Sequence, residues 1–154
     1  NPRDPQMRFI KGVILTNTGK TADAIATFTQ LTQDYPELPE PYNNLAVLYG
    51  AQGQFEKARA ELEMAVRANP GYAIAYENLG DVYARLAAQS YAKAVQLDAS
   101  IGASATPKLT LIRSMFASSA KSPKTPAASA AMASAPASAA VAPAAAKSGS
   151  DKKP

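Results

Sequence analysis

Hydrophobic positions in this chain recur at helical spacing. In residues 39–70, Tyr42, Leu45 and Tyr49 are three and four positions apart, which places them on one face of a helix. Gly53 interrupts the pattern, and a second stripe then leads to a terminating proline: Phe55, Ala58, Leu62, Ala65 and Pro70. The pattern predicts two amphipathic helices joined by a tight turn.

The hairpin pattern repeats with a period of 34 residues. Gly19 precedes Gly53 by one period, and Tyr42 and Tyr49 are followed one period later by Tyr76 and Tyr83. Small residues in these stripes should let paired helices approach closely, while the large ones fill the gaps between them: Ala46, Ala58, Ala65 and Gly80.

The third copy of the hairpin is shortened. Ala94 follows its counterpart Ala65 by 29 residues instead of 34, so five residues are missing, and the turn glycine is one of them. The apolar stripe nevertheless continues from Tyr76 to Leu97 with no proline. These features predict one continuous helix about 36 Å long. The alternative is a short turn around Gln89 and Ser90 followed by a separate last helix.

This pattern of aromatic, Leu, small, Tyr, Gly, aromatic, Ala and Pro positions resembles the tetratricopeptide repeat family. Residues 39–70 match it closely and residues 73–98 in part. In residues 5–36, Arg8, Lys11 and Leu15 replace the first-helix aromatic, Leu and Tyr. The resemblance implies an all-α fold, a three-unit solenoid of helical hairpins over residues 5–98. An unrelated bundle of helical hairpins is the alternative.

Residues 99–117 are predicted to be a linker and a terminal amphipathic helix. Thr106 is the expected N-cap and Pro107 the expected first-turn residue. Leu109, Ile112 and Phe116 share one face. This helix could fold back as a cap on the array, or it could be an exposed helix that docks a partner or a second copy.

Residues 118–154 have the composition of a disordered tail rich in Ala, Ser, Pro and Lys. The charge is distributed unevenly. Residues 1–98 hold nine Lys and Arg against eleven Asp and Glu, a net charge of −2, whereas residues 99–154 hold seven against one, a net charge of +6. The tail lacks interleaved aromatic residues, so we expect no specific nucleic-acid partner.

Composition also limits the chemistry. The chain has no cysteine and no histidine, which excludes disulfides, Cys/His zinc sites and Ser-His-Asp triads. No apolar run reaches the roughly 20 residues of a membrane span. We expect no catalytic activity, no cofactor and no metal site. The chain begins at Asn1, and a signal peptide or a fragment boundary before it would give the same sequence.

The family resemblance implies a site as well as a fold. In tetratricopeptide proteins the first helices of successive units line a concave groove that holds a peptide or a partner's helix. Carried over to this sequence, the groove is lined by Phe9, Ile10, Val13, Asn17, Glu40, Asn43, Asn44, Val47, Ile74, Glu77, Asn78, Asp81 and Arg85.

Two asparagines are the strongest candidates in this groove. Asn44 and Asn78 are one period apart, and a side-chain amide can both donate to and accept from a peptide backbone. Changing either to alanine should then weaken binding while barely altering melting. The alternative is that they make packing contacts within the array. Glu77 and Asp81, a like-charged pair one turn apart, indicate attraction for a basic segment or only a solvated surface.

Some tetratricopeptide domains hold a chaperone's terminal carboxylate with a Lys, Asn and Arg cluster, of which this sequence retains only Asn44. The sequence therefore favours a different ligand. We predict a non-catalytic adaptor that binds a protein or peptide segment. The alternative is a structural protein that forms homo-oligomers through its first-unit apolar surface and long third-unit helix. The absent cysteines and the tail composition favour a bacterial periplasm, with the cytoplasm as the alternative.

Overall fold

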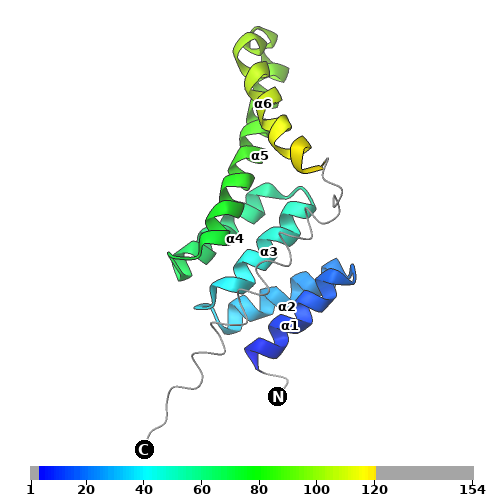
Figure 1. Cartoon of the computed structure of the whole chain (residues 1–154), viewed down its shortest axis with the longest axis vertical. Helices are drawn as coiled ribbons and strands as arrows, with labels where there is room; N and C mark the ends of the chain where they lie inside the picture. Colours follow the sequence, from blue (N-terminus) through cyan, green and yellow to red (C-terminus); the bar gives the residue numbers. More distant parts are fainter. Residues whose placement is uncertain (1–3, 121–154) are drawn as a thin grey trace, which may run out of the picture.

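The computed structural model describes residues 4–120, and all regular structure in this part is helical. Two helical hairpins come first: α1 (Pro5–Asn17) with α2 (Thr21–Asp34), and α3 (Pro39–Ala51) with α4 (Phe55–Ala68). A long helix, α5 (Ala73–Leu97), follows, and a 3-10 turn, η1 (Ala99–Ile101), leads into α6 (Gly102–Ala120). The two hairpins stack side by side, and α5 with α6 extends beyond them (Figure 1).

Glycine sets the turn in both complete hairpins. Gly19 and Gly53 have φ angles of 78° and 75°, in the left-handed region that other residues rarely adopt. The amide after each glycine closes the helix end, since Lys20 N–H donates to Leu15 O and Gln54 N–H donates to Tyr49 O, both at 2.9 Å. One period after Gly53 the chain has Ala87, and there the helix continues.

Helix α5 is continuous over 25 residues, as the single-helix interpretation predicts, and no turn occurs at Gln89 or Ser90. Its first half packs on α4, and its second half extends past the array beside α6 (Figure 1). The division of the chain into a three-unit array, a terminal helix and a tail stays a prediction.

The predicted start of the terminal helix is wrong. Helix α6 begins at Gly102, and Pro107 lies inside it. The N-terminal cap is Asp98, whose Oδ1 accepts from the Ser100 backbone amide at 3.0 Å and starts η1. Pro107 is the sixth residue of α6, so it removes one backbone hydrogen bond from the helix. The helix also runs to Ala120, past the predicted tail boundary, and the rest of the predicted tail lies outside the described residues.

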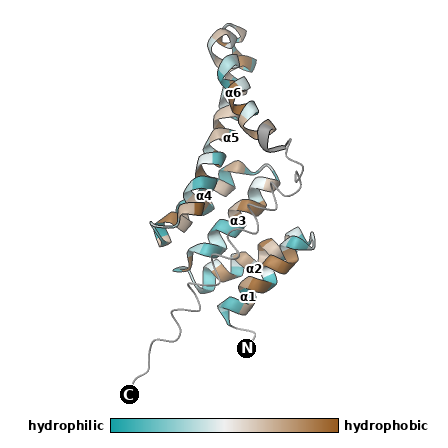
Figure 2. Cartoon of the chain, in the orientation of Figure 1, coloured by the Kyte–Doolittle hydropathy of each residue, from teal (hydrophilic) through white to brown (hydrophobic). Residues whose placement is uncertain are grey.

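Helix α6 folds back along α5. Ala105 and Leu109 are buried, Ile112 and Phe116 are half-buried, and Leu111 on the other side is exposed. The Arg85 guanidinium carbon of α5 lies 3.7 Å from the centre of the Phe116 ring. Within residues 4–120 no helix is long and apolar enough to cross a membrane. Both α5 and α6 contain hydrophilic as well as hydrophobic residues (Figure 2).

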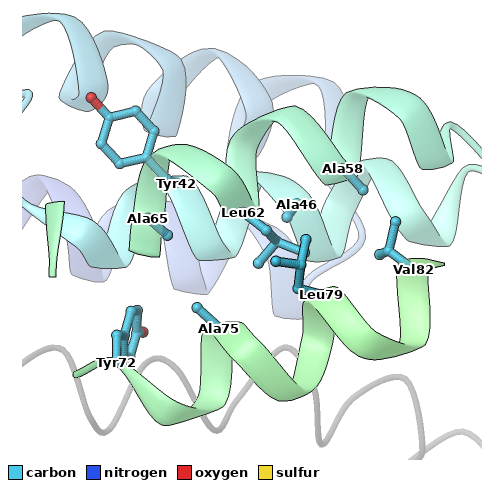
Figure 3. Close-up of a cluster of buried hydrophobic side chains, with 9 residues drawn as sticks. All are labelled: Tyr42, Ala46, Ala58, Leu62, Ala65, Tyr72, Ala75, Leu79 and Val82. Carbon is cyan, nitrogen blue, oxygen red and sulfur yellow. The ribbon is translucent and has the colours of Figure 1, made fainter. Parts of the chain in front are cut away.

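Two hydrophobic clusters hold the array together. The first joins α1, α2 and α3, and its members include Phe9, Phe28 and Leu45. The second joins α3, α4 and the first half of α5, and Figure 3 shows how its side chains meet between these helices: Tyr42, Ala46, Ala58, Leu62, Ala65, Tyr72, Ala75, Leu79 and Val82. Since α3 contributes to both clusters, it is the central helix of the fold.

Candidate functional site

The first-unit residues of the predicted groove separate into two groups. Phe9 is buried, with its ring 5.4 Å from that of Phe28 in an edge-to-face arrangement, and half-buried Val13 packs against the same cluster. Ile10 and Asn17 are exposed on α1. Phe9 and Val13 therefore contribute to the core, and only Ile10 and Asn17 are open to solvent.

The second-unit residues of the predicted groove are all buried. Glu40, Asn43, Asn44 and Val47 have exposed fractions of 7%, 0%, 5% and 8%. Burial is continuous along α3 from residue 40 to residue 48. Because nine successive residues cover more than two turns, α3 has no exposed side over this stretch.

The third-unit residues lie on the first half of α5 and differ in exposure. Ile74 is half-buried against the second cluster, and Asn78 is only 4% exposed. Glu77 is exposed, and Asp81 is half-buried one turn further along. Arg85 is exposed, and its guanidinium lies over the Phe116 ring.

A buried hydrogen bond joins α3 to α5. The Asn78 side-chain amide donates from Nδ2 to Oδ1 of Asn43 at 3.0 Å. The packing interpretation therefore holds for Asn78. We use the name α3–α5 seam for the polar residues on either side of this bond: Glu40, Asn43, Asn44, Tyr72, Glu77, Asn78 and Asp81.

The seam contains buried polar atoms that have no hydrogen-bond partner. They are Asn43 Nδ2, Asn44 Oδ1 and the Tyr72 hydroxyl, and in residues 4–120 no other side chain has such an atom. An unsatisfied buried polar group costs about 1–3 kcal/mol. Two hydrogen-bond donors and one acceptor at the junction of α3 and α5 thus have no partner.

The electrostatic environment of the seam is acidic. Burial raises the pKa of the Asp81 carboxyl, the neighbouring Glu77 raises it further, and Arg85 lowers it. Burial also raises the pKa of the Tyr72 hydroxyl, and the charge of Glu40 adds to that effect. Each shift shows that the site disfavours more negative charge. A cation near Glu77 and Asp81 would favour the charged form of the Asp81 carboxyl.

The chemistry available at the seam is that of hydrogen bonding and charge. A ligand amide could donate to Asn44 Oδ1, and a ligand carbonyl could accept from Asn43 Nδ2. Between residues 4 and 120, no three His, Cys, Asp or Glu side chains are grouped so that they could hold a metal ion. The arrangement suits recognition of a peptide backbone.

Two features of the site were missed by reasoning from the sequence. Tyr72 lies in the connection before α5, outside the helices from which the predicted groove was assembled, although a tyrosine between Pro70 and an apolar stripe is a signal for a buried loop residue. The Arg85–Phe116 contact was missed because the start of α6 was misplaced. Both features adjoin the predicted residues on α5.

A separate hollow of about 550 Å³ lies between α1 and α2, away from the seam. It is lined by Met7, Arg8, Lys11, Ala26, Thr27 and Gln30. An ion pair of 2.8 Å between Arg8 and Asp34 spans the two helices, and the hydrogen bond to Arg8 lowers the pKa of the Asp34 carboxyl. None of the predicted groove residues lines this hollow.

One protein-family model matches part of this chain. The model of a tetratricopeptide repeat family matches residues 16–89. The chain is similar to the tetratricopeptide repeat domain-containing protein PYG7, chloroplastic, of Arabidopsis thaliana, with 44% identity over 50 residues, which are 32% of this chain and 17% of that protein. No solved structure gives a significant match.

Two further relatives also contain this repeat. The TPR repeat-containing thioredoxin TTL4 of Arabidopsis thaliana is 35% identical over 75 residues, 49% of this chain and 11% of that protein. The TPR repeat-containing protein YvcD of Bacillus subtilis (strain 168) is 37% identical over 65 residues, 42% of this chain and 13% of that protein. The chain thus spans less than a fifth of the length of each relative.

Proposed function

We propose that this chain is an adaptor that binds an extended peptide segment along the α3–α5 seam. Its helical hairpins match the model of a tetratricopeptide repeat family over residues 16–89, and such repeats generally mediate protein binding. The observation that carries the proposal is the clustering of unpartnered polar atoms at Asn43, Asn44 and Tyr72. A peptide backbone offers the donors and acceptors that these atoms lack.

The acidic side chains of the seam favour a ligand that carries positive charge. Glu77 and Asp81 lie at the α5 side of the seam, and the pKa of Asp81 is raised because its charged form is disfavoured there. A ligand with Lys or Arg beside its backbone contact would be attracted to this end, and salt would weaken that part of the binding. We therefore propose a basic peptide as the preferred ligand. A periplasmic location is proposed on composition alone.

The test is selection of peptides from a random library on the immobilised chain, followed by measurement of the affinity of one selected peptide. Asn44→Ala should weaken binding by about 1–3 kcal/mol, which is about five- to 150-fold, because the ligand loses an acceptor at a buried contact. Gln33→Ala, an exposed amide on α2, is the matched control and should bind like the parent. Equal affinity for the Asn44→Ala variant and the parent would contradict the proposal.

The charge component has its own variants. Glu77→Lys and Asp81→Lys should each reduce the affinity for a basic peptide at low salt, and the reduction should fade as the salt concentration rises. Glu56→Lys on α4 changes the charge equally at an exposed position outside the seam. A selected peptide with no basic residue would leave the backbone contact in place and would contradict the preference for basic ligands.

A further inference from the structure

One stripe of α3 joins the two helices of the second hairpin. It consists of Tyr42, Ala46 and Tyr49, and α4 packs against it. In this packing Tyr42 and Ala46 are only 5% and 2% exposed. The side chains that α4 contributes to the contact are an aromatic residue, two alanines and a leucine: Phe55, Ala58, Leu62 and Ala65.

The equivalent stripe of α5 is uncovered in the part of the chain that the structure describes. It lies one period later and consists of Tyr76, Gly80 and Tyr83. Tyr76 and Tyr83 are 49% and 47% exposed, and a Cβ at Gly80 would have nothing within 4 Å. Helix α6 packs farther along α5, where Lys108 lies over the Tyr91 ring. We call Tyr76, Gly80 and Tyr83 the open stripe.

The open stripe adjoins the second hydrophobic cluster. The Tyr83 hydroxyl donates to Oε2 of Glu63 on α4 at 3.2 Å, so one edge of the stripe lies beside α4. Leu79 and Val82, the neighbours of the stripe in sequence, point from α5 toward α4 (Figure 3). A helix on the open stripe would therefore continue the α4–α5 interface, as each added layer does in a stacked array. Because α5 is already folded, such a helix would meet a preformed surface.

We propose that the open stripe binds an amphipathic helix of a partner protein, which replaces the second helix that the third copy of the hairpin lacks. The chain itself specifies the chemistry of this helix, because the open stripe repeats the stripe that α4 covers. The partner helix carries an aromatic residue, Ala, Leu and Ala at the spacing of Phe55, Ala58, Leu62 and Ala65. Its alanines allow close approach at Gly80, and its large side chains fill the space beside the two tyrosines. This site is separate from the α3–α5 seam.

The probe for the test is a synthetic peptide of residues 54–70, because α4 is the helix that the equivalent stripe binds. A lactam bridge between Glu56 and the lysine of Ala60→Lys, both on the exposed side of α4, keeps the peptide helical. Added to the isotope-labelled full chain, it should shift the amide signals of the open stripe and leave that of Gln33 on α2 in place. No shift in the stripe at a peptide concentration of about 1 mM would overturn the proposal.

Position 80 offers a matched pair of variants in the full chain. Gly80→Gln places a long polar side chain on the stripe and should weaken peptide binding by about tenfold or more. Gly80→Ala should bind the peptide like the parent, because Ala46 is the equivalent residue in the α3–α4 contact. Both changes are made at an exposed position inside a helix, where they favour folding. Equal affinity for the parent and Gly80→Gln would contradict the proposal.

The peptide offers a second matched pair. Leu62→Gln removes the apolar side chain that is buried in the α3–α4 contact, so it should weaken binding by about tenfold or more. Met64→Gln changes a residue that α4 exposes and should leave the affinity unchanged. A peptide that loses affinity equally with both changes would bind by unspecific apolar contact, and the proposal would be wrong.

Two further measurements identify the site and its occupant. Asn44→Ala should bind the helical peptide like the parent, and weaker binding would place the peptide on the seam and overturn the proposal. The same measurement separates this site from the proposed function, which Gly80→Gln should leave intact for a selected extended peptide. A mass in solution above 16.1 kDa that returns to this value in Gly80→Gln would assign the open stripe to a second copy, and would also overturn the proposal.

Discussion

Positions 12, 46 and 80 are equivalent in the 34-residue period, yet the fold uses them differently. A Cβ at Gly12 would lie 2.5 Å from Cζ of Phe28, so only glycine fits there without movement. Ala46 is buried in the second cluster. Gly80 has nothing within 4 Å of its Cβ position and is exposed, because the helix that would pack on it is missing from the third unit. The expectation that Gly80 permits close packing is therefore wrong.

These two glycines should respond oppositely to alanine. Gly80→Ala should stabilise the protein by about 0.5–1 kcal/mol, because alanine restricts the unfolded chain and favours the helix. Gly12→Ala should destabilise it by about 1–3 kcal/mol, because the new methyl group displaces the Phe28 ring. Urea unfolding of both variants beside the parent measures the difference, and a gain in stability for Gly12→Ala would contradict the packing described.

The Asn43–Asn78 hydrogen bond changes the effect on stability that we expect from mutating Asn78. Asn78→Ala leaves both polar atoms of Asn43 buried without a partner, so it should cost about 1–3 kcal/mol of unfolding free energy. This replaces the expectation from sequence that alanine here would barely alter melting. Thermal unfolding tests it, with Gln33→Ala expected within about 0.5 kcal/mol of the parent. No change for Asn78→Ala would mean that the bond contributes nothing to stability.

At the scale of elements, the turns and the continuity of α5 could be predicted from the sequence, because they depend on residues close together in the chain. Glycines 19 and 53 mark the two turns because each must adopt a positive φ, and Ala87 at the next equivalent position explains why α5 continues. The start of α6 was mispredicted because Thr106–Pro107 is a strong local signal, whereas Asp98 sets the start through η1. Burial of the predicted groove residues depends on tertiary contacts that no single-sequence pattern encodes.

Continuity of α5 can be tested with proline. Gln89 lies in mid-helix, so Gln89→Pro removes a backbone hydrogen bond, introduces a clash and should cost about 3 kcal/mol or more. Ala99→Pro is the matched control, since this residue starts η1 directly after its N-cap Asp98, where proline is tolerated. Urea unfolding measures both variants. A loss below about 1 kcal/mol for Gln89→Pro would favour a turn at that point.

At the scale of the whole molecule, the adaptor proposal concerns a single chain. Met7, Ile10 and Ile14 form an exposed apolar strip on α1, with exposed fractions of 55%, 38% and 55%. Single apolar residues are common on protein surfaces, whereas a contiguous strip is a candidate contact between copies of the chain. Sedimentation equilibrium should give 16.1 kDa at every concentration tested. A mass that doubles with concentration, and returns to 16.1 kDa in Ile14→Glu, would favour the self-assembling alternative.

Helix α5 belongs both to the repeat array and to the pair that it forms with α6. In most repeat proteins each unit can open separately, because neighbouring units meet only at an interface. Here a break between the array and the α5–α6 pair would have to occur inside a helix, where it costs backbone hydrogen bonds on top of side-chain contacts. The end of the molecule farthest from the central helix is therefore tied thermodynamically to the core. Heating should melt the two as a single cooperative unit, without fraying from this end.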